Sequence, residues 1–172
     1  CDLTESNRME AFAKEVPERF WDVGVAEQNM MGIAAGLALS GKIPFIASYA
    51  VFSPGRNWDQ LRVSVCYSNA NVKVVGSHAG VSVGPDGPTH QALEDLAMTR
   101  VLPNLTVVYP CDAIEARKAT IEAAKHRGPV YLRLAREKSA VMTSETSPFT
   151  IGKASILRDG PDVAIIATGP LV

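Results

Sequence analysis

Neither sign of charge is in excess in this sequence. Its 17 lysines and arginines nearly balance its 18 aspartates and glutamates, which leaves a net charge of −1. Proteins that bind nucleic acid or anionic membranes electrostatically normally carry a clear positive excess. The longest apolar run, around residues 33–39, is too short and too rich in glycine and alanine to cross a bilayer. We therefore expect no nucleic-acid partner and no membrane association.

Cysteine is scarce, and its spacing suggests no pairing. The three cysteines, Cys1, Cys66 and Cys111, are odd in number and form no CxxC pair. The sequence therefore indicates neither a disulfide framework nor a zinc site, and we assign no metal ligands in this chain. It also begins without the basic residues and cleavage site of a secretory signal. A reducing cytoplasm is the simplest compartment for such a protein.

The composition itself is that of an ordinary globular protein, with 47% hydrophobic and 20% charged residues in a chain of 172. Short apolar or β-branched runs alternate with helical patterns. We expect strands at residues 20–23, 44–48, 72–77, 105–109 and 130–134, with weaker signals at 151–156 and 162–167. We expect helices from a cap at Ser6 to about residue 16, at 27–40, at 56–68, from 89 or 90 to 100, and at 113–126 after Asp112. This alternation predicts an α/β fold with a mostly parallel central sheet and helices on both faces.

Glu27 is the most informative single residue. It begins a helix that carries no further charge before Lys42, so most faces of that helix are apolar and it is expected to be buried. A carboxylate there is costly to bury unless it is paired. From position alone two interpretations stay open: Glu27 stabilises the helix N-terminus, or it is a working group of a site.

Several chemically active side chains follow predicted strands. In open parallel sheets, ligands bind beyond the carboxyl ends of the strands. The residues in such positions are Glu27, Tyr49, Phe52, His78, Asp86, Cys111 and Arg136. The pattern therefore predicts a ligand site at one edge of the sheet.

A series of motifs in this chain resembles the pyrimidine-binding domain of transketolases, which use thiamine diphosphate. The motifs occur in the family order from about residue 2 to 136: DVGVAEQNM (22–30), PFIASYAVF (44–52), WDQLR (58–62), GSHAGVSVGPDGPTH (76–90), ALEDLA (92–97), YPCD (109–112) and YLRLAR (131–136). The resemblance implies a thiamine diphosphate-binding fold. It further implies transfer of a two-carbon ketol unit between sugar phosphates, as in the pentose phosphate pathway.

The resemblance also assigns roles to individual residues. Glu27 matches the acid that hydrogen-bonds N1′ of the coenzyme aminopyrimidine, and Phe52 matches the aromatic residue stacked on that ring. Tyr49, and with less support Trp58, would line the same pocket. His90 would lie near the coenzyme amino group and the substrate, and both His90 and His78 are suited to passing protons. The residues implied to bind substrate are His78, Asp86, Arg136 and Ser6, the last two through the sugar phosphate; Ser6 as a simple helix cap is an equal alternative.

Two features depart from the family pattern. The segment 53–57, SPGRN, is one residue longer than is common in transketolases, and the Gly-Asp-Gly motif of the diphosphate-binding domain does not occur. We therefore expect half of an active site, with Mg²⁺ and the coenzyme diphosphate held by a separate subunit or domain, and no activity from this chain alone. By resemblance, we also expect a homodimer through the helices at 27–39 and 56–68.

The chain is expected to be a fragment of a longer polypeptide. Residues 1–137 would form the pyrimidine-binding domain, 138–160 a linker, and 161–172 the start of a truncated C-terminal domain. Two other functions stay open. One is an enzyme similar to 1-deoxyxylulose-5-phosphate synthase, which more often has Gln-His after the glutamate where this chain has Gln28-Asn29. The other is a non-catalytic module derived from the family.

Overall fold

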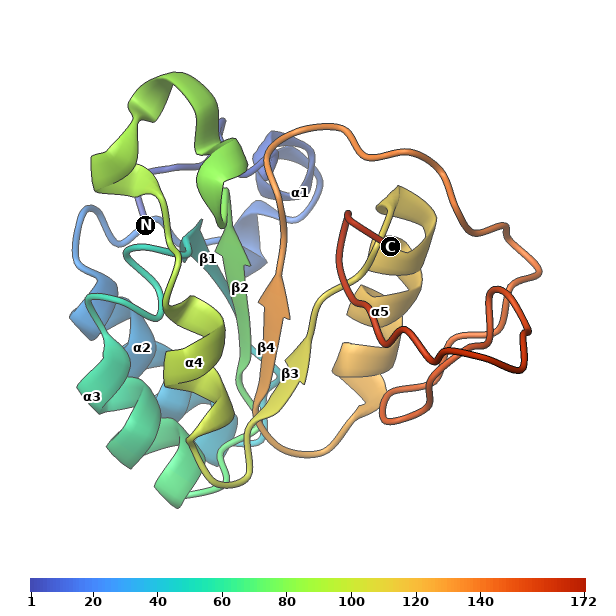
Figure 1. The fold of residues 1–172 in the computed structure, drawn as a ribbon. Helices are drawn as coiled ribbons and strands as arrows, with labels where there is room; N and C mark the ends of the chain where they lie inside the picture. The colour runs from blue at the N-terminus through green and yellow to red at the C-terminus, as the bar shows by residue number, and fades with distance from the viewer.

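The structure, a computed structural model, describes all of residues 1–172 and is built on a four-stranded parallel sheet (Figure 1). Its strands are β1 (Phe45–Tyr49), β2 (Lys73–Ser77), β3 (Thr106–Val108) and β4 (Val130–Arg133), in the order β1-β2-β4-β3. All three strand pairings are parallel. The predicted α/β fold with a parallel sheet is therefore confirmed.

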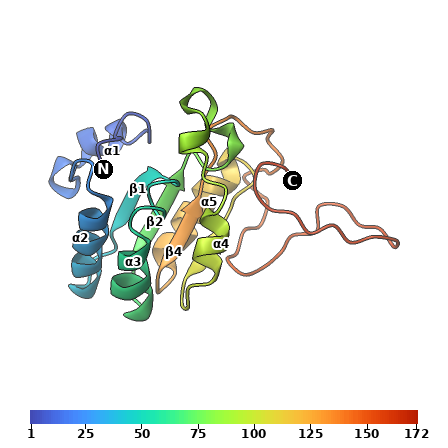
Figure 2. The ribbon, with the colours of Figure 1, turned by 60° about the vertical axis from the view of Figure 1, so that its left-hand side comes forward.

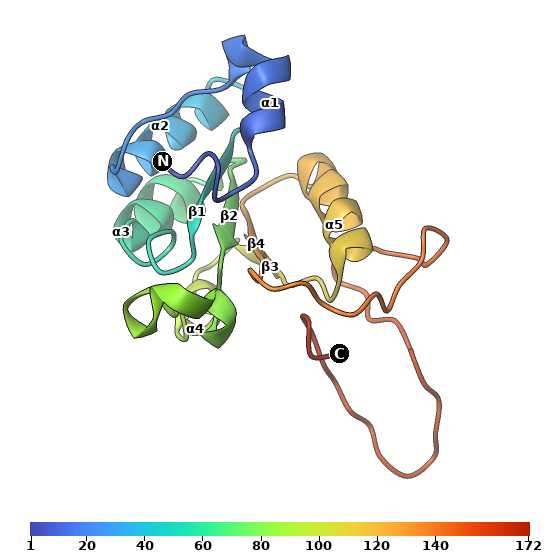
Figure 3. The same ribbon diagram turned by 90° about the horizontal axis from the view of Figure 1, so that it is seen from above.

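Helices cover both faces of the sheet, as the view along its edge makes clear (Figure 3). One face carries α2 (Glu27–Leu39), α3 (Trp58–Gln60) with its π-helical continuation η2 (Leu61–Tyr67), and α4 (Asp95–Arg100). The opposite face carries α5 (Ala113–Lys125). Short helical segments complete the chain: α1 (Glu10–Glu15), η1 (Pro17–Arg19), η3 (Val81–Asp86) and η4 (Pro88–His90).

Side-chain alternation along the strands creates a separate core on each face. Tyr131 of β4 joins the larger cluster with side chains of α2 and η2, such as Met31 and Leu61. Its neighbours Val130 and Leu132 point the other way and pack on Ala119 and Ala123 of α5 and on Val108 of β3. Because both faces are covered, β4 is buried at every position.

Buried charges in this fold are paired or fully hydrogen-bonded. The Arg133 guanidinium lies 2.8 Å from Asp95 Oδ2, and the Tyr131 hydroxyl donates to the same oxygen at 2.8 Å. The ammonium of Lys73 is enclosed and donates to Asn71 Oδ1 and to the carbonyl oxygens of His126 and Gly128 at 2.6–2.8 Å. These contacts meet the requirement that buried polar groups find partners.

Three predicted strands are wrong. Residues 20–23 form no strand, because Asp22 accepts a hydrogen bond from Gly24 N–H in a local turn and Trp21 is exposed. Residues 151–156 are not a strand either, because Gly152 has a positive φ of 84° within a turn. Residues 162–167 are exposed and pair with no strand. An apolar run of residues does not form a strand where no neighbouring strand is available to pair with its backbone.

Two helix starts also differ from the prediction. Ser6 lies in a turn and does not cap α1, which begins at Glu10 without a side-chain cap. The helix expected from residue 89 or 90 begins only at Asp95. Residues 88–90 instead form the short 3₁₀ helix η4, and Gln91 after it is extended, with φ −80° and ψ 102°, so the α-helix cannot begin there.

Beyond β4 the chain has no helix or strand and forms an extended arm that is prominent in Figure 2. Its first part is attached to α5 by Asp112, the N-cap of that helix. The Asp112 carboxylate accepts from Glu115 N–H within the helix and from the backbone N–H groups of Met142 and Thr143 in the arm. At the far end, Thr168 and Gly169 donate to the carbonyl oxygen of Tyr109.

The domain boundaries at 137 and 160 stay predictions.

None of the helices combines the length and the apolar character that crossing a bilayer would require.

Asp112 should give the fold a measurable stability at neutral pH. Burial alone would raise the pKa of Asp112, but the hydrogen bonds from Glu115, Thr143 and Met142 outweigh it and lower the pKa from 3.8 to about 2. A carboxyl whose pKa is lower in the folded state stabilises the fold above its unfolded pKa and loses that effect as pH falls through the folded pKa. Asp112→Asn should therefore cost about 2 kcal/mol at pH 7 and much less near pH 2.

Urea unfolding of both proteins at pH 7, 4 and 2.5 measures this difference. Asp162→Asn, on the exposed arm, is the matched control and should follow the parent chain at every pH. An equal loss of stability for Asp112→Asn at pH 7 and pH 2.5 would contradict the assignment.

Candidate active site

Glu27 lies at the start of α2 and is 2% exposed. No side chain caps this helix, so the first backbone N–H groups and the positive end of the helix dipole face the region of the Glu27 carboxylate. The Glu27 carboxylate also accepts a hydrogen bond of 2.7 Å from Arg56 Nη1 to Oε2. Both interpretations of Glu27 thus fit its position, since it begins the helix and also faces a neighbouring loop.

That loop is a tight turn that connects β1 to α3. Arg56 N–H donates to the Phe52 carbonyl oxygen at 2.8 Å, and a Cβ on Gly55 would overlap the carbonyl oxygen of Val51. The turn brings the Arg56 guanidinium back over the Phe52 ring, with Cζ 4.5 Å from the ring centroid. Asn57 Nδ2 donates to Glu27 O and to Ser53 Oγ, which fastens the turn to α2.

Four predicted site residues form an aromatic cluster beside this turn. The rings of Tyr49 and Phe52 are nearly parallel, with centroids 6.1 Å apart, and Tyr49 stacks on His78 at 4.0 Å. The His90 ring meets Phe52 edge-on at 5.5 Å and Tyr49 at 6.3 Å. The structure therefore brings together Tyr49, Phe52, His78 and His90, with Glu27 joined to them through Arg56.

His78 is held in an unusual backbone conformation directly after β2. Its φ is 53°, a region that non-glycine residues seldom occupy and that often accompanies functional sites. Ring atom Nδ1 lies 3.1 Å from Ser77 Oγ, which in turn donates to Asn7 Oδ1. Burial and the nearby Arg136 cation lower the pKa of His78 below its usual 6.5, and Asp86 only partly offsets them. His78 is therefore a neutral imidazole at physiological pH, able to accept or donate one hydrogen bond at each nitrogen.

Arg136 and Asp86 both lie near enough to His78 to influence its pKa. Arg136 Nη1 donates to the Val83 carbonyl oxygen at 2.7 Å and so fastens the η3 turn to the end of β4. Asp86, at the end of η3, is exposed. Of the predicted substrate residues, Asp86 and Arg136 thus lie near His78 but make no hydrogen bond to it.

Three singled-out residues lie apart from this cluster. Ser6 makes no hydrogen bond to any site residue, whereas its neighbour Asn7 does reach Ser77. Trp58 Nε1 donates to the Met98 carbonyl oxygen and packs against the larger core, so it has a structural position. Cys111 lies before α5, where burial and Glu115 raise the pKa of its thiol to about 12.

Sequence reasoning missed Arg56, Asn57 and Asn7 as site residues. The departure of the segment 53–57 from the family pattern was a signal near the first two, but it did not indicate the contact of Arg56 with Phe52. Nothing in the sequence marked Asn7, whose partner Ser77 is 70 positions away.

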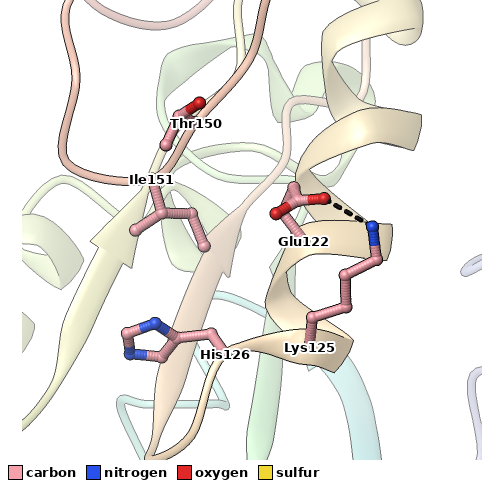
Figure 4. Close-up of a pocket in the computed structure, with 5 residues that line it drawn as sticks. All are labelled: Glu122, Lys125, His126, Thr150 and Ile151. Carbon is pink, nitrogen blue, oxygen red and sulfur yellow. Dashed lines mark hydrogen bonds and ion pairs between the residues drawn. The ribbon is translucent and has the colours of Figure 1, made fainter.

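A further hollow lies on the opposite face of the sheet, at the end of α5 (Figure 4). It is lined by Glu122, Lys125, His126, Thr150 and Ile151, and its charged groups are already paired by a 2.8 Å bridge from Lys125 to Glu122. None of the predicted site residues contributes to it.

A parallel α/β sheet with a buried acid beside stacked aromatic rings at the strand ends is the architecture of a pyrimidine-binding domain. Residues 1–141 match the family model described as the transketolase pyrimidine-binding domain. The chain belongs to this family.

Several relatives of this chain are named as subunits or sections of transketolases. The chain is 46% identical over 172 residues to the 6-deoxy-6-sulfo-D-fructose transketolase subunit SqwH of Clostridium sp. (strain MSTE9), covering 100% of this chain and 53% of the relative. It is 42% identical over 162 residues to an apulose-4-phosphate transketolase subunit of Phocaeicola vulgatus, covering 94% and 52%. A solved split-gene transketolase, described as an inactive β4 tetramer, superposes with a TM-score of 0.88 at 45% identity, covering 99% and 55%. The chain thus spans about half the length of these relatives.

The turn that carries Phe52 and Arg56 should depend on Gly55. A methyl group at this position would meet the backbone oxygen of Val51, which cannot move without breaking the turn. Gly55→Ala should therefore lower the free energy of unfolding by about 1–3 kcal/mol, the usual range for overpacking. Chemical denaturation measures the loss, and Gly160→Ala, where an added Cβ meets nothing within 4 Å, is the control. Equal stability of the two variants would show that the turn is not constrained as described.

Proposed function

We propose that this chain is the pyrimidine-binding half of a thiamine diphosphate-dependent transketolase that transfers a two-carbon ketol unit between sugar phosphates. The observation that carries the proposal is the buried Glu27 carboxylate, which is linked through one guanidinium to the flat ring of Phe52. The planar guanidinium of Arg56 already lies between Glu27 and Phe52, so the site suits a coenzyme ring that is also flat and rich in nitrogen. Family membership supports the coenzyme class.

Glu27 would hold the hydrogen bond to N1′ of the aminopyrimidine, and Phe52 would stack on the ring. Thiamine diphosphate, when bound, supplies the carbon that accepts the ketol unit. Tyr49 and His90 would complete the ring pocket, since their ring centroids lie 6.1 and 5.5 Å from that of Phe52. The neutral imidazole of His78 can accept a proton at a ring nitrogen, and His90 would lie near the coenzyme amino group and the substrate.

The substrate would enter on the His78 side of the cluster. His78 and Asp86 suit sugar hydroxyls, and the planar fork of Arg136 suits a phosphate. Ser6 is retained as a phosphate ligand from the resemblance. Relatives of this chain are named for different sugars, a sulfofructose in one case and apulose 4-phosphate in the other. Activity assays with different sugar phosphates would therefore identify the sugar that this chain uses.

A second subunit or domain would supply the Mg²⁺ site and bind the coenzyme diphosphate. Two of the relatives are named as transketolase subunits, and the split-gene β4 tetramer is described as inactive. We infer from these likenesses that the present chain is a transferase component that needs a diphosphate-binding partner for activity.

A homodimer would form through the outer surface of α2 and η2. This surface is apolar, with Ile33, Leu39, Val63 and Tyr67 all at least 42% exposed. Exposed apolar side chains gathered on neighbouring helices are typical of a protein interface.

Activity should require both the partner and Glu27. We expect ketol transfer from xylulose 5-phosphate to ribose 5-phosphate only when the full-length polypeptide is mixed with the diphosphate-binding subunit, Mg²⁺ and thiamine diphosphate. Glu27→Ala should reduce the rate by at least about 100-fold, the usual scale of a lost proton-transfer group. Glu10→Ala, an exposed acid of α1, is the matched control and should keep full activity.

Two outcomes of this assay would contradict the proposal. Release of carbon dioxide from pyruvate without ketol transfer would identify a synthase-like enzyme. Absence of both reactions in an assembled complex would identify a non-catalytic module.

The proposed interface is tested by sedimentation. The parent chain should sediment as a dimer, and Leu39→Glu should yield a folded monomer because a charge on the interface is costly to desolvate. Leu157→Glu, in the exposed arm, should leave the dimer intact. A parent chain that stays monomeric at high concentration would exclude this interface.

A further inference from the structure

Arg56 lies where the coenzyme ring is proposed to lie. Its Nη1 is 2.7 Å from Glu27 Oε2 and its Cζ is 4.5 Å from the centroid of the Phe52 ring. One guanidinium therefore engages both the acid that would receive the aminopyrimidine and the aromatic wall that would stack on it. A bound ring and this guanidinium cannot occupy the same space.

The backbone of Arg56 is fixed, whereas its side chain is free to leave. Its N–H donates to Phe52 O, and its carbonyl oxygen accepts from Gln28 Nε2 at 3.4 Å. The next residue, Asn57, is buried and bonded to Glu27 O. The Arg56 side chain itself is 46% exposed and makes one ion pair. Only rotation of this side chain is needed to open the space between Glu27 and Phe52.

We propose that Arg56 is a stand-in for the coenzyme aminopyrimidine, which holds Glu27 and Phe52 in the ligand-free subunit and is displaced when the coenzyme binds. This inference rests on the proposed function. The two groups correspond in shape and in contacts: both are flat, both contain an N–C–N unit, and both place a nitrogen atom within hydrogen-bond reach of Glu27 while stacking on an aromatic face. The stand-in satisfies a carboxylate that would otherwise be buried without a partner.

Displacement has a cost that appears in the coenzyme affinity. A ligand that binds only the open form has an apparent Kd equal to its intrinsic Kd divided by the fraction of molecules that are open. A half-exposed ion pair and an exposed cation–π contact are each weak. Together they favour the closed form over the open form by a factor of about 3–10. Arg56 thereby acts as a positioning residue that keeps the empty site ordered and makes coenzyme binding weaker than the pocket alone would give.

The test uses the full-length polypeptide assembled with its diphosphate-binding subunit. Mg²⁺–thiamine diphosphate is titrated by calorimetry without sugar, for the parent and for Arg56→Met, which keeps an unbranched side chain but removes the charged guanidinium. We expect the Kd of Arg56→Met to be about 3–10-fold lower. Arg100→Met, an exposed arginine at the end of α4, is the matched control and should leave the Kd unchanged. A merely structural arginine would give the opposite sign, because its loss would weaken binding.

Arg56→Lys provides a second variant should Arg56→Met fold poorly. Lysine keeps the charge but cannot stack as a flat group. The Kd of Arg56→Lys for the coenzyme should therefore also be lower than that of the parent. An unchanged or raised Kd in both variants would overturn the inference and leave the proposed function standing. Failure of the parent, the control and both variants to bind the coenzyme would overturn the proposed function and, with it, this inference.

Discussion

The carboxylate of Glu27 is the constraint on which the rest of the site depends. It is almost fully removed from water, where an unpaired charge costs several kcal/mol even after relaxation. Two features offset that cost, the start of α2 and the guanidinium of Arg56, and Asn57 fastens the neighbouring turn to the helix through the backbone carbonyl oxygen of Glu27. The same turn positions Phe52, so the acid and the aromatic wall are fixed by one piece of backbone. The turn that folds this part of the chain therefore also sets the geometry of the proposed coenzyme site.

A second buried ion pair performs the corresponding task on the opposite side of the site. Arg133, at the end of β4, binds Asp95 at the start of α4 and also donates to the Ala92 carbonyl oxygen. These bonds hold the chain that follows the histidine loop against the sheet. Since removing one partner of such a pair leaves a buried charge, Asp95 and Arg133 constrain each other.

The sequence allowed the parallel sheet, the two covered faces and the Asp112 cap of α5 to be predicted, because each depends on local periodicity or on a single capping residue. It also indicated the residues of the aromatic cluster. It failed where apolar segments lack a neighbouring strand, as at 162–167, and at the start of α4, because the extended backbone of Gln91 separates η4 from that helix. The contact of Arg56 with Glu27 spans 29 positions and depends on how one turn closes, which no local pattern encodes.

The enclosure of Lys73 has a consequence for chemical labelling. Its ammonium is bonded to three oxygen acceptors contributed by the start of β2 and by the connection from α5 to β4. An amine-reactive reagent can reach this nitrogen only after those two segments separate, whereas Lys125 on the surface of α5 is accessible throughout. The acylation rate of Lys73 relative to Lys125, measured by mass spectrometry, therefore reports how often these two segments of the sheet separate.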